Sequence, residues 1–244
     1  MLLAEKFILL HIDEKKGKIP WLGHIIVNKS YGTSIGSLVL MELILKKKIT
    51  FETIKKKTFI RVIDDSTTGD KFLDESLAMI QDYKKKKTLK KLESVLVNLS
   101  RFTNLKKRMR LFNNLFERLD QQGIIRIEKK FKTGGNPARM FSGGRQALIQ
   151  PEVKRNILSE ILDVVNNNKE PSESTVLLIT LLNAKEDFLM FPKESRKFVK
   201  EQFKEFCMKD LSSFGETIEK VRRMMHQVMK VDPIPVPGVL DGFY

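Results

Sequence analysis

The sequence is poor in cysteine and has no long apolar run, and each absence excludes a class of protein. A single cysteine, Cys207, excludes a disulfide framework and a thiolate-rich zinc site, and is typical of a reducing compartment. The longest apolar run, residues 35–45, contains Glu42 and is too short to span a bilayer. The N-terminal stretch has no cleavage pattern, and Leu2 stands where myristoylation needs glycine, so we expect neither a signal peptide nor a lipid anchor.

The chain also lacks the residue patterns of a catalytic or metal centre. His11, His24 and His226 lie far apart and have no carboxylate or cysteine neighbours at metal-ligand spacing. No phosphate-binding loop, nucleophile elbow or zinc-protease motif occurs. Carboxylates gather between residues 64 and 75, but helix capping and solvation explain them more simply than metal binding or acid–base work. We therefore expect a protein that is not an enzyme and has no catalytic residue, metal or cofactor.

Positive charge is abundant and unevenly distributed. The 244 residues carry 45 Lys and Arg against 30 Asp and Glu, a net charge of +15. Residues 1–150 hold 31 basic and 15 acidic side chains, a net +16, whereas residues 151–244 hold 14 and 15, a net −1. A one-sided field of this size indicates an anionic partner, either a membrane surface or nucleic acid.

Basic runs recur through successive elements of the first 150 residues, at 46–48, 55–57, 84–87, 90–91, 106–110 and 129–132. Each run alone is usually a solvated face, but together they predict one strongly positive face of the molecule. Lysine and arginine near an anionic bilayer contribute about 1 kcal/mol each, and similar charges release counterions from nucleic acid. Charge alone does not separate the two partners.

The hydrophobic periodicity predicts a mainly α-helical fold. Residues 3–13 fit either a helix or a strand and turn. Residues 19–34 resemble an irregular loop, and Ser34 is placed to cap a helix over about 35–48. That helix is apolar nearly all round, so we expect it to be buried, with a hydrogen-bond or ionic partner for Glu42.

Two strands are predicted at 49–54 and 57–64, followed by a helix that Asp70 caps. Helices are then expected at about 89–100 and 105–122, the second ended by Gly123. A β-hairpin follows, with a strand at 123–131, a turn at 134–137 and a return strand at 138–142.

The remainder is predicted to be mostly helical from residue 152, with a buried helix at 174–184 and amphipathic helices within 193–211 and at 214–231. We expect a single helical domain over residues 1–232, with a buried central helix and a protruding β-hairpin. Residues 233–244 are expected to form an extended, proline-rich tail.

Five segments, read in order, resemble one family. They are LLAEKFILLHIDEKKGK (2–18), LVLMELILKKKITFE (38–52), TGDKFLDESLAMI (68–80), LFERLDQQGIIRIEKK (115–130) and VLLITLLNAKEDFL (176–189). The third segment keeps the Thr-Gly-Asp and Leu-Asp-Glu pattern most closely. The sequence resembles the Golgi phosphoprotein 3 family of phosphoinositide-binding peripheral membrane proteins, colinearly over roughly residues 2–230.

The resemblance implies a cytoplasmic adaptor, peripherally associated with a Golgi-like membrane, that binds anionic lipid, above all phosphatidylinositol 4-phosphate. Its further partners would be cytoplasmic tails of membrane proteins, and the oligomeric state is left open. The family frames the headgroup with one tryptophan and three arginines. Trp21 matches the tryptophan, but the arginine positions fall on Gly36, Met109 and Phe112. Lys29, Arg108 and Arg110 are therefore the expected substitutes in the headgroup site.

The predicted basic face and the resemblance together indicate residues that contact the membrane surface. The lysine run contributes Lys84, Lys85, Lys86 and Lys87. The tip of the hairpin at 123–142 contributes Met140 and Phe141, which we expect to enter lipid, and Lys132 and Arg139, which we expect to meet headgroups.

Two other readings stay open. Residues 105–145, a helix followed by Gly123 and a basic hairpin, also fit a winged-helix nucleic-acid-binding protein, although no short helix and tight turn precede residue 105. The other reading is a protein–protein adaptor whose positive face binds acidic tails.

Overall fold

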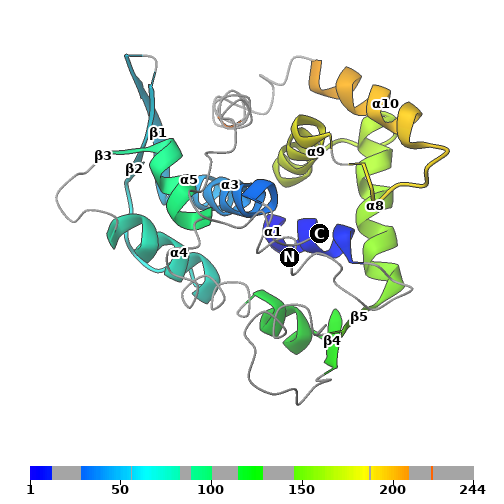
Figure 1. The fold of residues 1–244 in the computed structure, drawn as a ribbon, viewed down its shortest axis with the longest axis horizontal. Helices are drawn as coiled ribbons and strands as arrows, with labels where there is room; N and C mark the ends of the chain where they lie inside the picture. Colours follow the sequence, from blue (N-terminus) through cyan, green and yellow to red (C-terminus); the bar gives the residue numbers. More distant parts are fainter. Residues whose placement is uncertain are drawn as a thin grey trace, which may run out of the picture.

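The computed structural model describes residues 1–12, 29–55, 57–82, 89–100, 115–128, 146–186 and 188–208, together with Val221. Most of these residues are helical (Figure 1). The helices are α1 (Leu3–His11), α3 (Lys29–Leu45), α4 (Lys71–Asp82), α5 (Leu92–Ser100), α8 (Pro151–Val165), α9 (Glu173–Lys185) and α10 (Arg196–Met208). The strands are β1 (Ile49–Ile54), β2 (Lys57–Val62), β3 (Leu89–Lys91), β4 (Ile125–Glu128) and β5 (Gln146–Ile149). The mainly helical class is confirmed.

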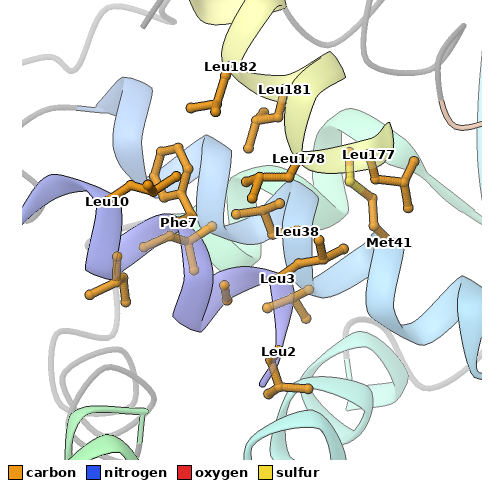
Figure 2. Packing of buried hydrophobic residues seen from close by; sticks show 14 of the residues in the cluster. Leu2, Leu3, Phe7, Leu10, Leu38, Met41, Leu177, Leu178, Leu181 and Leu182 are labelled. Atoms are coloured by element: carbon orange, nitrogen blue, oxygen red, sulfur yellow. The ribbon is translucent and has the colours of Figure 1, made fainter. Parts of the chain in front are cut away.

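Three helices whose sequences are apolar on nearly every side meet at the centre. α1 contacts α3, α8 and α9, and α3 also contacts α4 and α5. A helix without a polar face must be covered all round, and residues 34–41 of α3 are buried accordingly. Figure 2 shows this packing with side chains from all three helices: Phe7 and Leu10 of α1, Leu38 and Met41 of α3, and Leu177, Leu178, Leu181 and Leu182 of α9. The predicted buried central helix is confirmed.

A small antiparallel sheet in the order β1-β2-β3 lies beside this core. Ile49 pairs with Val62 at one end of the β1–β2 ladder, and Ile54 pairs with Lys57 at the other. Because side chains alternate between faces, Ile49 and Ile60 lie on one face with Lys90 of β3, and all three are buried. α3 contacts β1, and α5 contacts β2 and β3. The predicted strands at 49–54 and 57–64 are confirmed, although the second ends at Val62, two residues earlier than expected.

The ends of α3, of the helical residues 115–121 and of α8 share one capping geometry. After α3, the amide of Lys48 donates to the carbonyl of Leu43, and Lys47 has a φ of 56°. Gly123 and Asn167 occupy the same left-handed position after residues 115–121 and after α8, with φ of 68° and 62°. Glycine and asparagine are the usual residues there, whereas a lysine pays a steric penalty. Gly123 therefore ends its helix as predicted, and Lys47 is the unusual member of the set.

Charged groups are buried where α1, α4 and residues 115–121 meet. Glu5 of α1 is fully buried, and its Oε1 lies 2.7 Å from Nε of Arg118. Arg118 also pairs with Asp70, whose Oδ1 accepts hydrogen bonds from the amides of Phe72 and Leu73 at the start of α4. We call Glu5, Asp70 and Arg118 the buried charge cluster. Asp70 caps α4 as expected, and the cluster ties three segments together.

Glu42 finds the partner that its burial requires. Its Oε1 accepts a hydrogen bond from the amide of Leu3 at the start of α1, so a side chain of α3 caps a neighbouring helix. Burial nevertheless raises the pKa of Glu42 above its ordinary value, against the lowering effect of that amide and of Lys46.

Three details of the prediction are wrong. Ser34 does not cap the central helix, because α3 begins at Lys29 and places Ser34 inside it, fully buried. Residues 89–91 pair with β2 rather than starting a helix, and α5 begins at Leu92. The strand that pairs with β4 is 146–149 rather than 138–142, which lies outside the described residues.

The last part of the described chain is helical, as predicted. Ser172 caps α9, its hydroxyl accepting a hydrogen bond from the amide of Thr175. α10 packs Val199, Phe203 and Phe206 inward and contacts α8 and α9. Of the expected helix at 214–231, the structure describes Val221, which is helical and buried. The proposed tail at 233–244 lies outside the described residues.

Candidate functional site

Most of the predicted lipid-contact residues lie outside the described part of the chain. This applies to Trp21, Arg108 and Arg110 of the headgroup site and to the surface residues Lys84, Lys85, Lys86, Lys87, Lys132, Arg139, Met140 and Phe141. Lys29 is the first residue of α3, so it opens a helix rather than lying in a loop, and its backbone alone is described. These assignments stay predictions.

Gly36, where the resemblance implies an arginine in other members of the family, is described, and its surroundings are closed. Gly36 sits where α3 contacts α5, and a Cβ placed on it would lie 3.3 Å from Cβ of Leu99 and 3.6 Å from Cδ2 of Leu96. The glycine therefore permits close approach of the two helices. A long cationic side chain at residue 36 has no room in this arrangement, which agrees with the idea that any headgroup cation must come from elsewhere.

The described basic runs divide into buried and exposed lysines. Lys48 is buried, and its Nζ lies 2.6 Å from both Oδ2 of Asp64 and Oγ of Ser66. Lys90 is also buried, and its ammonium donates to the carbonyls of Ile80 and Gln81 at the end of α4, where the helix dipole favours a cation. These two lysines stabilise the fold, so they do not contribute to the predicted basic face.

The other described lysines of these runs are exposed. Lys46 and Lys47 follow α3, Lys55 and Lys57 lie at the tip of the β1–β2 hairpin, and Lys91 ends β3. The sheet register places Lys91 opposite Phe59 and Lys57 opposite Ile54. None of the five forms an ion pair with a carboxylate among the described residues.

One face of the sheet combines cations with apolar side chains. Ile54, Lys57 and Phe59 alternate onto the face opposite Ile60, and Lys91 lies beside Phe59. Ile54 is 42% exposed and Phe59 is half-buried. We call Ile54, Lys55, Lys57, Phe59 and Lys91 the hairpin surface. On the same face Arg61 is neutralised by Glu52, with 2.5 Å from Nε to Oε1 and 3.1 Å from Nη2 to Oε2.

Sequence reasoning found the lysines of this surface but missed its apolar members. Ile54 and Phe59 read as ordinary strand residues, and their outward position depends on which face α3 and α5 cover. One available signal was the basic turn itself, because two-residue hairpin turns normally use asparagine, aspartate or glycine.

The described residues define the class of the molecule: a mainly helical protein with an apolar three-helix centre and a basic β-hairpin at its margin. No described helix is both long and apolar enough to cross a bilayer. Within the same ranges, His, Cys, Asp and Glu side chains do not gather in groups of three or more suited to a metal ion.

The chain belongs to the Golgi phosphoprotein 3 (GPP34) family, whose model matches residues 3–225. It is also similar to a VPS74-like protein of Dictyostelium discoideum, with 28% identity over 195 residues that cover 78% of this chain and 71% of that protein. The resemblance drawn from the five segments is thereby confirmed. Membership fits a trafficking adaptor of Golgi membranes.

Proposed function

We propose that the protein is a peripheral membrane protein that binds anionic lipid, with phosphatidylinositol 4-phosphate as its preferred headgroup. The observation that carries the proposal is the family match, together with exposed lysines that form no ion pair with a described carboxylate. A net charge of +16 over the first 150 residues attracts an anionic surface, and lysines near such a surface contribute about 1 kcal/mol each. Family membership does not favour the nucleic-acid alternative.

The proposed headgroup site consists of Trp21, Lys29, Arg108 and Arg110. Guanidinium groups bind phosphate oxygens with paired hydrogen bonds, and an indole supplies an apolar wall that excludes water. The proposed surface contacts are the lysines at 84–87 and the basic and apolar residues between β4 and β5. The closed position at Gly36 supports the proposal that Lys29 and the two arginines supply the cations of this site.

In the cell we propose that the protein lies on the cytoplasmic face of a Golgi-like membrane and links that membrane to the cytoplasmic tails of its resident proteins. No enzymatic activity is expected. A homo-oligomer is compatible with this role.

A flotation series tests the proposal. The full chain is mixed with vesicles of phosphatidylcholine alone, with added phosphatidylserine, or with added phosphatidylinositol 4-phosphate, at low and at physiological salt. We expect flotation with both anionic compositions, stronger with the phosphoinositide, and weaker at the higher salt, where the Debye length is about 8 Å. Flotation with neutral vesicles that ignores salt contradicts the proposal, as does a DNA gel shift at salt that abolishes lipid binding.

Specificity is tested by Arg108→Ala with Arg110→Ala. If the two arginines hold one headgroup, the loss of affinity is larger for the phosphoinositide than for phosphatidylserine. Equal losses for both lipids show that these residues contribute only to a diffuse field.

A further inference from the structure

The β1–β2 hairpin projects from the sheet at the margin of the molecule, away from α10 (Figure 1). Its core-side residues Thr58 and Ile60 are buried, whereas Ile54 at the last ladder pair is 42% exposed. A single exposed isoleucine is ordinary. Here it lies on the same face as the half-buried Phe59, diagonally across the ladder, with Lys57 opposite Ile54 and Lys91 opposite Phe59.

Apolar side chains flanked by lysines match the interface of an anionic bilayer. Lysine ammonium groups reach phosphates at headgroup depth while their alkyl stems lie along apolar surface. An isoleucine at the end of a hairpin can enter the acyl boundary without exposing unpaired backbone groups. Here the backbone of Ile54 is paired with that of Lys57 in the ladder. On the same face, Glu52 forms an ion pair with Arg61, so its negative charge does not cancel the positive charge of the three lysines.

The turn provides a second, independent observation. Lys55 has a φ of 47°, a left-handed conformation that side chains with a Cβ adopt at a steric penalty. Asparagine or glycine would fill this position without the penalty. This strained, exposed lysine makes no described contact that stabilises the fold, and strain without such a contact is expected where a residue is used for binding.

We propose that the hairpin surface inserts Ile54 into anionic membranes while Lys55, Lys57 and Lys91 bind the surrounding headgroups. This contact is separate from the headgroup site proposed above and from the residues between β4 and β5. It rests on the proposed function, since it presumes that the protein binds anionic bilayers.

A fluorescent probe at the tip tests the insertion. In a Cys207→Ser background, Ile54→Cys is labelled with an environment-sensitive nitrobenzoxadiazole group. The matched control is Phe198→Cys, an exposed apolar residue of α10 that is 58% accessible. With vesicles of phosphatidylcholine, phosphatidylserine and phosphatidylinositol 4-phosphate, we expect a blue shift and a gain of about twofold or more in emission at position 54, and no change at position 198.

Flotation of the same labelled samples separates the outcomes. A protein that floats while the probe at position 54 stays silent overturns the insertion but leaves the proposed function standing. A protein that does not float overturns both. A blue shift at position 54 that needs no vesicles and grows with protein concentration shows contact between copies, and overturns the insertion.

Charge reversal provides a second measurement that needs no label. Lys55→Glu with Lys57→Glu is compared with Lys193→Glu with Lys197→Glu, which changes the net charge equally at exposed positions before and within α10. We expect the hairpin pair to weaken vesicle binding about tenfold or more and the control pair about twofold, with unchanged circular dichroism in both. Equal losses indicate a diffuse field and overturn the proposal.

Discussion

The buried charge cluster and the hairpin surface use similar residues for opposite purposes. In the cluster, the cation of Arg118 meets the carboxylates of Glu5 and Asp70, and Glu5 is shielded from water. On the hairpin surface, the lysines are exposed to solvent and form no ion pair with a carboxylate among the described residues. Burial makes the removal of a charge costly, whereas exposure makes it cheap for stability and important for binding. Stability and membrane binding should therefore respond to different mutations.

The largest effect is expected when the cluster loses its cation. Arg118→Ala leaves Glu5 buried without its ionic partner, so the free energy of unfolding should fall by about 3 kcal/mol. Urea unfolding followed by circular dichroism measures it, and vesicle binding of the folded fraction should be unchanged. The double variant Glu5→Gln with Arg118→Met should be more stable than Arg118→Ala, because it removes the buried carboxylate that has lost its ionic partner. Loss of vesicle binding in the folded Arg118 variant would break the comparison.

Adding a charge to the packed region should cost stability and add no binding. Gly36→Arg places the family's residue between α3 and α5, where a Cβ already lies 3.3 Å from Leu99. We expect the free energy of unfolding to fall by about 2 kcal/mol through overpacking, with no gain in affinity for phosphatidylinositol 4-phosphate. Gly36→Ala is the matched variant with little added volume. A gain in phosphoinositide affinity would show that α5 yields and that the family pocket can be rebuilt.

The sequence predicts much of the distinction between the buried core and the exposed surface, because the central packing follows from composition. Helices that are apolar on all sides have to be covered, and this placed α3 and α9 in the core. The cap at Asp70 and the helix end at Gly123 were also predicted correctly, because both depend on local backbone chemistry. The errors fall where tertiary contacts decide. Residues 89–91 have helical periodicity, but pairing with β2 turns them into a strand. Ser34 looks like a cap only until packing extends α3 to Lys29.

The charged residues show the same limit. Lysines at 46–48 and 90–91 look equivalent in the sequence, yet Lys48 and Lys90 are buried and hydrogen-bonded. Which lysine of a run turns inward depends on the phase of the strand or helix end that carries it. The outward position of Ile54 and Phe59 follows from which face the helices cover, and a single sequence does not specify this.

A smaller effect is expected where a basic residue occupies a glycine position. Lys47→Gly should raise the free energy of unfolding by about 0.5 to 1 kcal/mol, because the left-handed conformation no longer meets a Cβ. Asn167→Gly is the matched control at the same helix-end position and should gain less, since asparagine tolerates that conformation. Thermal unfolding measures both, and equal gains would contradict the assignment of a steric penalty to Lys47.

Lys55→Gly should have two opposite effects, since strain and binding meet in one residue. Stability should rise by about 0.5 to 1 kcal/mol, for the same steric reason as at Lys47. Affinity for anionic vesicles should fall by about fivefold, the loss expected for one lysine near the bilayer. A rise in stability without any loss of binding would show that this lysine is strained for another reason.

The smallest effect concerns an ion pair of intermediate burial, in which Lys48 is buried and Asp64 is about half exposed. The hydrogen bond from Lys48, assisted by Ser66, lowers the pKa of Asp64 from 3.8 to about 2. Because the folded state holds the carboxylate in its ionised form, this contribution is complete above pH 3.8 and is lost as the pH falls toward 2. Asp64→Asn should therefore flatten the acid limb of the stability profile in that window and leave vesicle binding at neutral pH unchanged. Asp65→Asn, at the exposed neighbouring position, is the control and should keep the slope. If both variants keep it, Asp64 is not held by Lys48 in solution, and Lys48 belongs with the exposed lysines instead.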